Sequence, residues 1–196
     1  ARLMPDLSHS EQTKLRDKAI EIMEKLARDQ ETKVREILAE EIKESGLVPP
    51  HLVKRLAFDP AISVCGPILR YSPLLSDTDL IEILATSQVT GVIEAIAGRE
   101  HLASEVSDKV VASLDVPAIA TLLANKSADI RAETMDEIIA NAEHVAAWHE
   151  PIVMRPDLSV RAVRRIAQFV GRELLQSLAA RTGLDDETRK TLAGRV

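Results

Sequence analysis

Hydrophobic residues recur along this chain at spacings of three and four, and segment 34–60 shows this amphipathic-helix period most clearly. One predicted helical face carries Val34, Ile37, Leu38 and Ile42. Ser45-Gly46 follows, and we expect Gly46 to end that helix in the left-handed conformation. Pro49-Pro50 then opens a second helix, because proline is tolerated in a first helical turn. The apolar face of this second helix consists of Leu52, Val53, Leu56 and Ala57.

Such a hairpin leaves both apolar faces uncovered, so it must stack on similar hairpins. The ends of successive hairpins read LARD, LAFD, LATS, LANKS and RPD, at residues 26–29, 56–59, 84–87, 123–127 and 155–157. Each end supplies a short polar side chain, which we expect to cap the next helix, as Asp59 would after LAFD. Predicted helix starts at 34 and 64, and at 130 and 160, repeat the same interval. Ends and starts together indicate a repeat of about 30 residues.

Extended over the whole chain, the pattern predicts roughly thirteen helices and no strand. The expected fold is therefore all-α, an α-solenoid of stacked helical hairpins. Residues 1–7 read as a leader, and residues 8–196 as a single helical-repeat domain with possible halves 8–87 and 88–196. Ser8 and Glu11 have the spacing of a capping box that starts the first helix, and Gly183 and Asp185 precede the last one.

Composition narrows the functional classes. Hydrophobic residues make up 45% of the chain but aromatic residues only 2%, so the core must consist of Leu, Ile, Val and Ala. The net charge of −6, with both signs intermixed, argues against nucleic-acid binding and against binding to anionic membranes. The single cysteine, Cys65, excludes an internal disulfide and a cysteine-based metal site, and we expect it to be buried. A cytoplasmic protein without a cofactor is expected.

The candidate binding residues lie mainly near the C-terminus. Residues 99–157 contain five Lys/Arg and eleven Asp/Glu, whereas residues 158–196 contain eight and four. If one helix runs through Gly171, then Arg161, Arg165 and Arg172 share one face, with Arg164 at its flank. Arginines side by side suit carboxylates and phosphates, which predicts an anionic or acidic partner. The alternative is a solvated helix face with no partner.

Two further residues are weaker candidates. Arg99 follows a predicted helix end, where it could form an internal ion pair or bind a ligand. Trp148 lies on an apolar stripe, which favours the core over a binding contact. His144 and His149, five residues apart, point to different helical faces and make a poor metal pair. The sequence contains no catalytic motif that we recognise, so no catalytic or metal-binding residue is predicted.

Four strings carry a resemblance to a known family: RYSPLLSDTDLIEILA (70–85), AIAGREHLASEVSDKVV (95–111), LLANKSADI (122–130) and MRPDL (154–158). In this order and spacing they resemble the bacterial domain of unknown function 2336, a family of HEAT-like or leucine-rich-variant-like helical repeats. The resemblance covers the chain from about Val34 onward. It implies a HEAT-like fold, and it implies no activity and no catalytic residue.

The sequence therefore favours a non-catalytic scaffold whose stacked helices bind another protein or a peptide. Two alternatives remain: a nucleic-acid-binding HEAT-like protein, which needs a positive surface, and an enzyme with a site assembled from scattered acidic residues. The oligomeric state is not indicated by any pattern in the chain.

Overall fold

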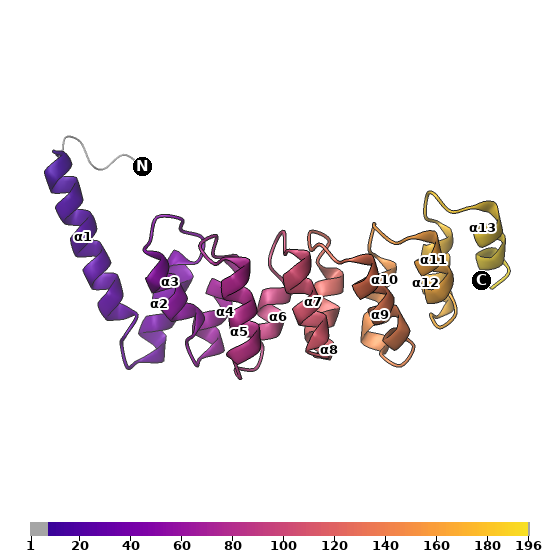
Figure 1. The fold of residues 1–196 in the computed structure, drawn as a ribbon, viewed down its shortest axis with the longest axis horizontal. Coiled ribbons are helices and arrows are strands. Elements are labelled where there is room, and N and C mark those ends of the chain that lie inside the picture. The colour runs from indigo at the N-terminus through magenta and orange to yellow at the C-terminus, as the bar shows by residue number, and fades with distance from the viewer. Residues whose placement is uncertain (1–7, 196) are drawn as a thin grey trace. The chain divides into compact units, whose positions relative to one another are not determined.

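The structure is a computed structural model that describes residues 8–195, so the predicted leader at 1–7 lies outside the described residues. Within 8–195 the protein is all-α, with thirteen α-helices, one short 3-10 helix and no strand (Figure 1). The helices are α1 (His9–Leu26), α2 (Thr32–Ile42), α3 (Pro50–Ala57), α4 (Ile62–Tyr71), α5 (Asp77–Thr86), α6 (Val92–Ala97), α7 (Ser104–Ala112), α8 (Val116–Ala124), α9 (Ala132–Ala142), α10 (His149–Val153), α11 (Val160–Ile166), α12 (Arg172–Ala179) and α13 (Asp186–Ala193). The 3-10 helix spans Ala146–Trp148.

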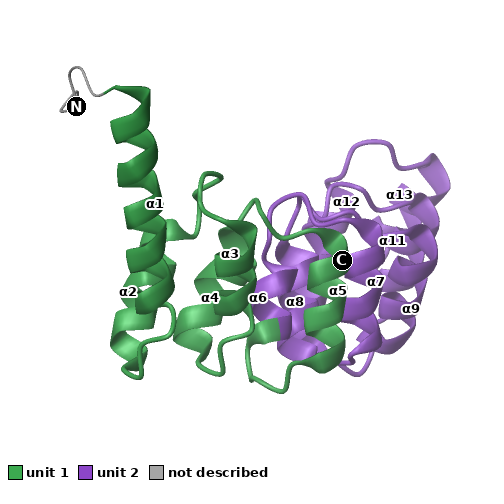
Figure 2. Ribbon diagram, turned by 60° about the vertical axis from the view of Figure 1, so that its left-hand side comes forward, with its two compact units in different colours: residues 1–92 green, residues 93–196 purple. Residues whose placement is uncertain are grey.

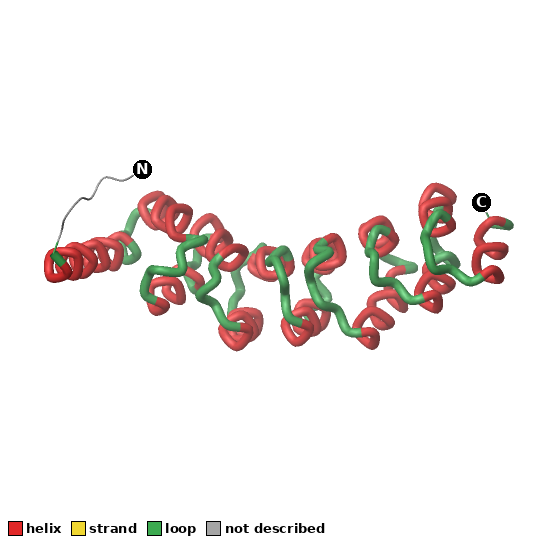
Figure 3. The backbone as a smooth tube through the Cα atoms, turned by 90° about the horizontal axis from the view of Figure 1, so that it is seen from above, coloured by secondary structure: helices red, strands yellow, loops and turns green. Residues whose placement is uncertain are grey.

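The chain divides into two compact units, residues 1–92 and residues 93–196 (Figure 2). Within each unit the helices form packed hairpins, and successive helices after α1 alternate between two rows (Figure 3). This is the hairpin stacking of an α-solenoid, so the predicted fold class and the predicted number of helices are both confirmed. None of the helices that the structure describes is long and apolar enough to cross a bilayer.

Unit 1 (residues 1–92) is built around α4, on which both α2 and α3 pack. The apolar face predicted for α3 is buried in full: Leu52, Val53, Leu56 and Ala57. Cys65 on α4 is also buried, as expected, and burial raises the pKa of its thiol to about 11. The first helix, α1, begins with the predicted Ser8–Glu11 capping box, yet none of its own residues is buried. It therefore leaves one side open to solvent.

Unit 2 (residues 93–196) is held together by a repeated side-chain bond in addition to its aliphatic core. The side-chain amide of Asn125 donates to the Ala97 carbonyl, 28 residues earlier, at 2.9 Å. Three arginines repeat this bond to earlier carbonyls: Arg155 to Asn125 at 3.1 Å, Arg181 to Val153 at 3.1 Å, and Arg195 to Ala167 at 2.9 Å. Because carbonyls at helix ends lack an intrahelical donor, these bonds satisfy them and connect successive layers.

The repeat ends do not cap helices as predicted. The side-chain oxygens of Asp29, Asp59, Ser87 and Asn125 each accept from the backbone N–H two residues later. At Asp59 the reason is spacing: the N-cap of α4 is Ala61, which leaves the carboxylate within reach of the Ala61 N–H alone. Asp59 also pairs with Arg35 at 2.6 Å, so the repeat ends serve as turns and ties.

One prediction about glycine is wrong. Gly46 is not left-handed, since the glycines with positive φ among the described residues are Gly91 and Gly183. The last residues of α2 instead run on into a turn at Ser45. The condition for grouping Arg172 with Arg161 and Arg165 is not met, because α11 ends at Ile166 and Gly171 is the extended N-cap of α12. By contrast, Gly183 (φ +82°) and Asp185, whose side chain caps α13, behave as predicted.

Candidate functional site

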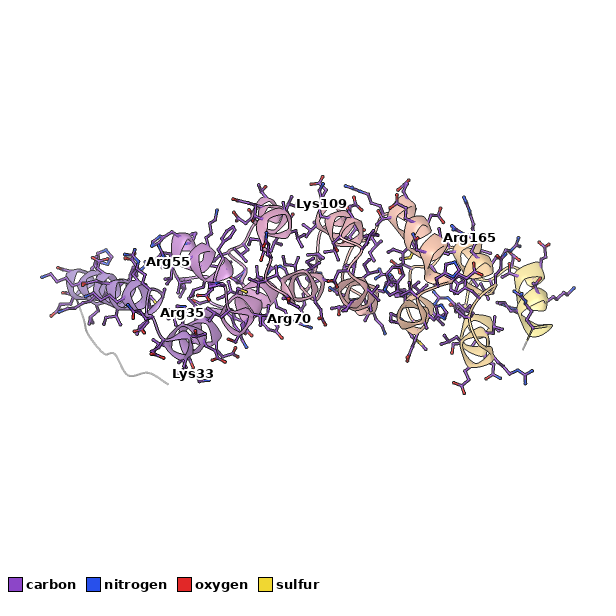
Figure 4. All side chains as sticks on the ribbon, turned by 90° about the horizontal axis from the view of Figure 1, so that it is seen from below. Lys33, Arg35, Arg55, Arg70, Lys109 and Arg165 are labelled. Carbon is purple, nitrogen blue, oxygen red and sulfur yellow. The ribbon has the colours of Figure 1, made fainter. Side chains whose placement is uncertain are left out.

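Three of the four arginines predicted to form a surface do line one groove. α11 starts at the N-cap Ser159, and its buried face consists of Ala162, Val163 and Ile166. That burial turns Arg161, Arg164 and Arg165 outward, where they border a groove of about 320 Å³ together with Val160, Gln168 and Asp185. Figure 4 labels Arg165 in this part of unit 2. We call this the α11 groove.

Arg172 does not belong to the α11 groove. The predicted common face required a continuous helix, but the chain leaves the helical conformation between Ile166 and Arg172. Arg172 is instead the first residue of α12 and is exposed. The grouping of Arg172 with Arg161 and Arg165 was therefore wrong, because Gly171 interrupts the helix that the grouping assumed.

The arginines of the α11 groove are already engaged with the protein's own carboxylates. Arg164 donates to the Thr188 hydroxyl at 2.6 Å, to Asp185 at 3.2 Å and to Glu187 at 3.0 Å. The backbone N–H and the hydroxyl of Thr188, together with Arg164, hold the pKa of Asp185 below its ordinary value. These bonds leave Arg164 little capacity for an external anion.

The other two arginines of the groove share a single carboxylate on α9. Arg165 forms a hydrogen-bonded ion pair with Asp136, and the Arg161 guanidinium lies 4.0 Å from that same side chain. Arg161 is the most exposed of the three arginines, and its contact with Asp136 is the longest. The α11 groove therefore has arginines side by side, as the sequence suggested, but most of their charge is balanced locally.

The two remaining candidates have structural surroundings. Trp148 is buried, and its indole N–H donates to the Val116 carbonyl of α8 at 3.0 Å. Its ring is part of the unit 2 core, the alternative that the sequence favoured. Arg99 is half-buried in the turn after α6, and its carbonyl accepts from the side-chain amide of Asn125. Both residues are therefore placed where they support packing between neighbouring helices.

A second groove, in unit 1, was not predicted. It lies between α1 and α3, has a volume of about 480 Å³ and is lined by Glu24, Arg28, His51, Leu52, Lys54, Arg55 and Phe58. We call it the α1–α3 groove. Its floor is the buried Leu52, and at its edge Phe58 remains 48% exposed. Figure 4 shows Arg55 and Lys33 of α2 on opposite sides of unit 1.

The packing of α3 explains this arrangement. Because Leu52, Val53, Leu56 and Ala57 face the core, the intervening residues His51, Lys54, Arg55 and Phe58 must face outward. Across the groove, His51 contacts Glu24 of α1 at 2.8 Å. These two residues are 27 positions apart, close to one repeat. Comparing charges at that offset, instead of along one helix, is the signal that would have found the groove.

The charges of the α1–α3 groove are unequally matched. Glu24 is engaged by His51, and Lys54 pairs with Asp79 at 2.6 Å. Among residues 8–195, Arg28 and Arg55 have no carboxylate partner and no side-chain hydrogen bond. Both are exposed and both border Phe58 in the same groove. The groove thus presents two unpaired guanidinium groups beside an exposed aromatic ring.

The fold and these grooves define the class of the protein: an all-helical repeat protein with stacked hairpins and open surface grooves. Among the described residues, no three His, Cys, Asp or Glu side chains are grouped as a metal would require. The chain belongs to the bacterial family described as "Uncharacterised protein conserved in bacteria (DUF2336)", which matches residues 64–196. Searches of curated proteins and of solved structures give no match. The match begins in α4, so the α1–α3 groove lies on its N-terminal side.

Proposed function

We propose that this protein is a non-catalytic scaffold that binds a segment of another protein or a peptide in its α1–α3 groove. The observation that carries the proposal is the exposed ring of Phe58 beside Arg28 and Arg55, neither of which has a partner among the described residues. Large aromatic residues and arginines are the types that contribute most to protein interfaces. A cytoplasmic location belongs to the same proposal.

The exposed groups of the α1–α3 groove can gain free energy by binding a partner, and this gain is not made when the chain folds. Covering the exposed half of Phe58 is worth about 1 kcal/mol, since full burial of a large apolar side chain contributes about 1.5–3 kcal/mol. A hydrogen bond from an unpaired guanidinium to a carboxylate adds about 1.5–3 kcal/mol. Neither gain is made by the chain itself, so both are open to a partner.

The alternative of nucleic-acid binding has weaker support. A phosphate backbone is bound by many cations, whereas the chain has a net charge of −6. Single-stranded nucleic acids also stack on successive aromatic rings, and the groove contains one phenylalanine. A protein segment needs only a few contacts of mixed apolar and ionic character, which the α1–α3 groove offers.

A selection from a random 12-residue peptide library on the full 196-residue chain tests the proposal. The affinity of each enriched peptide is measured for the natural protein, for Phe58→Ser and for the control Tyr71→Ser. Tyr71 is a suitable control because it is also 48% exposed in unit 1 and does not line the groove. We expect Phe58→Ser to weaken binding about fivefold, which corresponds to about 1 kcal/mol, and Tyr71→Ser to leave it unchanged.

The proposal fails if no peptide is enriched, or if the enriched peptides bind equally to both variants. Thermal unfolding of each variant checks that both remain folded, which we expect because the two substitutions remove apolar surface that is half exposed.

A further inference from the structure

Resting on that proposed function, we infer that the segment bound in the α1–α3 groove is acidic and carries at least one apolar or aromatic residue. The inference follows from which charges in the groove are satisfied and which are not. The groove is lined by three Lys or Arg side chains and one carboxylate, that of Glu24. Glu24 contacts His51 at 2.8 Å and forms no ion pair with Arg28 or Arg55 in the structure.

Nearby carboxylates outside the lining are also committed. Asp79 pairs with Lys54 at 2.6 Å and completes the capping box of α5 through Ser76. Asp59, which directly follows Phe58 in the chain, pairs with Arg35 and is buried. Both acids therefore already have a cationic partner, whereas Arg28 and Arg55 have no acidic one among the described residues. An acid from a partner meets no such competition.

The position of the two arginines explains why the chain tolerates them unpaired. Arg55 lies in the last turn of α3, and Arg28 lies two residues beyond the end of α1. Helix C-termini carry partial negative charge, which makes cations acceptable there. That field does not occupy the guanidinium N–H groups, which face solvent and can donate to a partner's carboxylate. A planar carboxylate accepts two such bonds at once, which a neutral amide does not match.

Phe58 adds the second requirement. Its exposed ring adjoins the buried Leu52 in the floor of the groove. A segment made only of acidic residues would leave this ring in water, so an apolar or aromatic residue must accompany the acids. The combination of acids with one apolar anchor distinguishes this ligand from a free phosphate and from a purely acidic tail.

The experiment determines the sequences and affinities of the peptides selected above. We expect the groove-dependent peptides to contain at least two Asp or Glu and one large apolar residue. Replacing those acids by Asn or Gln should weaken binding at least tenfold, as measured by fluorescence anisotropy of the labelled peptide. Raising the salt from 50 to 300 mM should weaken the acidic peptide several-fold and its neutral analogue little.

The protein-side test is Arg28→Glu with Arg55→Glu, compared with Arg172→Glu and Arg189→Glu. The control arginines lie on α12 and α13, are exposed, have no side-chain partner among residues 8–195 and give the same change in net charge. We expect at least tenfold weaker binding of the acidic peptide to the first variant and less than twofold change for the second. Equal losses would show a net-charge effect and overturn the inference.

Failure of the inference differs from failure of the proposed function. If peptides depend on Phe58 but are neutral or basic, or retain affinity for Arg28→Glu with Arg55→Glu, the groove binds peptides and the acidic preference is wrong. If no peptide depends on Phe58, both are wrong. A labelled 12-nucleotide oligouridine that binds the groove as tightly as the acidic peptides would also overturn the inference, as would self-association abolished by the same arginine substitutions.

Discussion

The two arginine-lined grooves differ in what surrounds their guanidinium groups. In the α11 groove of unit 2, Arg164 donates to three acceptors on and before α13, and Arg165 pairs with Asp136 of α9. In the α1–α3 groove of unit 1, Arg28 and Arg55 have no such partner among the described residues. The α11 groove has more arginines close together in the sequence, yet fewer of their guanidinium groups are free to bind a ligand.

This difference shows that charge density along the chain and charge available to a ligand are separate properties. Arginines three and four apart on one helix are visible in the sequence, but the acids that neutralise them come from elements more than 20 residues away. Availability is set by the tertiary neighbours. The predictions that follow test this contrast, beginning with an arginine that is committed completely.

The largest effect is expected at Arg155, the extreme case of a committed arginine. It is 1% exposed, pairs with Asp157 at 2.7 Å and donates to the carbonyls of Asn125 and Ala128. Arg155→Met preserves much of the volume but leaves two carbonyls without this donor. We expect the free energy of unfolding to fall by about 3 kcal/mol.

Urea unfolding followed by circular dichroism measures this change. Arg172→Met, which alters an exposed arginine of the same unit, should change stability by less than about 0.5 kcal/mol. A loss below about 1 kcal/mol for Arg155→Met would show that its bonds to the carbonyls contribute little.

The next prediction is that the α11 groove binds acidic peptides, as proposed for the α1–α3 groove, once carboxylates beside its arginines are removed. Asp136→Asn with Asp185→Asn should free Arg161 and Arg165 of their carboxylate partner and leave Arg164 with Glu187 as its remaining carboxylate partner. Asparagine still caps a helix as well as aspartate, so α13 should keep its start. On the background of Arg28→Glu and Arg55→Glu, we expect affinity for a labelled hexaglutamate peptide at 50 mM salt to rise about tenfold, or about 1.4 kcal/mol.

The control makes the same change in net charge elsewhere in unit 2. Glu173→Gln with Asp186→Asn removes two exposed carboxylates that pair with no arginine of the α11 groove. If this control gains as much affinity as the first variant, local release of arginine is not the cause and the contrast between the grooves loses its explanation.

Much of the fold could be read from the sequence, because it depends on local periodicity. The apolar face of α3 and the capping box at Ser8 lie where the pattern placed them. One of the errors is accompanied by a distant contact. Asp59 turns toward Arg35, 24 residues away, instead of capping α4, and no pattern within one helix reports that contact.

The site was less predictable for the same reason. α11 could be recognised as rich in arginine, but Asp136 and Asp185 reach it from separate elements. The α1–α3 groove joins residues 24–28 to residues 51–58, and its free charge depends on Asp79 holding Lys54. One sequence reveals which residues are charged, whereas only the packed layers reveal which charges remain unmatched.

A smaller effect is expected at Leu114, an exposed apolar residue of unit 2 with a strained backbone, which serves as a comparison for Phe58. Leu114, at the end of α7, is 72% exposed and has φ of +57°, a left-handed conformation that leucine rarely adopts. Leu114→Gly removes this strain but adds flexibility to the unfolded chain. We expect the free energy of unfolding, measured by thermal unfolding, to rise by about 0.5–1 kcal/mol. The peptide affinity should stay unchanged.

Ala112→Gly provides the comparison, because Ala112 is the last residue of α7 and glycine should cost about 0.5–1 kcal/mol there. If Leu114→Gly weakens the selected peptides as much as Phe58→Ser does, then unit 2 contributes to binding and the contrast between the two grooves is wrong.

The smallest effect concerns the ion pair that withdraws Lys54 from the α1–α3 groove. Burial raises the pKa of Asp79, but hydrogen bonds from Lys54 and Ser76 outweigh it, so that pKa lies below its ordinary value. A carboxyl group with a lowered pKa in the folded state stabilises the fold above its ordinary pKa, and this stability is lost as pH falls through the folded value. Urea midpoints of the natural protein and of Asp79→Asn should therefore differ at pH 6 and begin to converge as the pH falls below about 4. Protonation also frees Lys54, which adds a third unpaired cation to Arg28 and Arg55. A difference in midpoints that persists undiminished to pH 3 would mean that Asp79 acts through its packing, and that the balance of charges in this groove is set elsewhere.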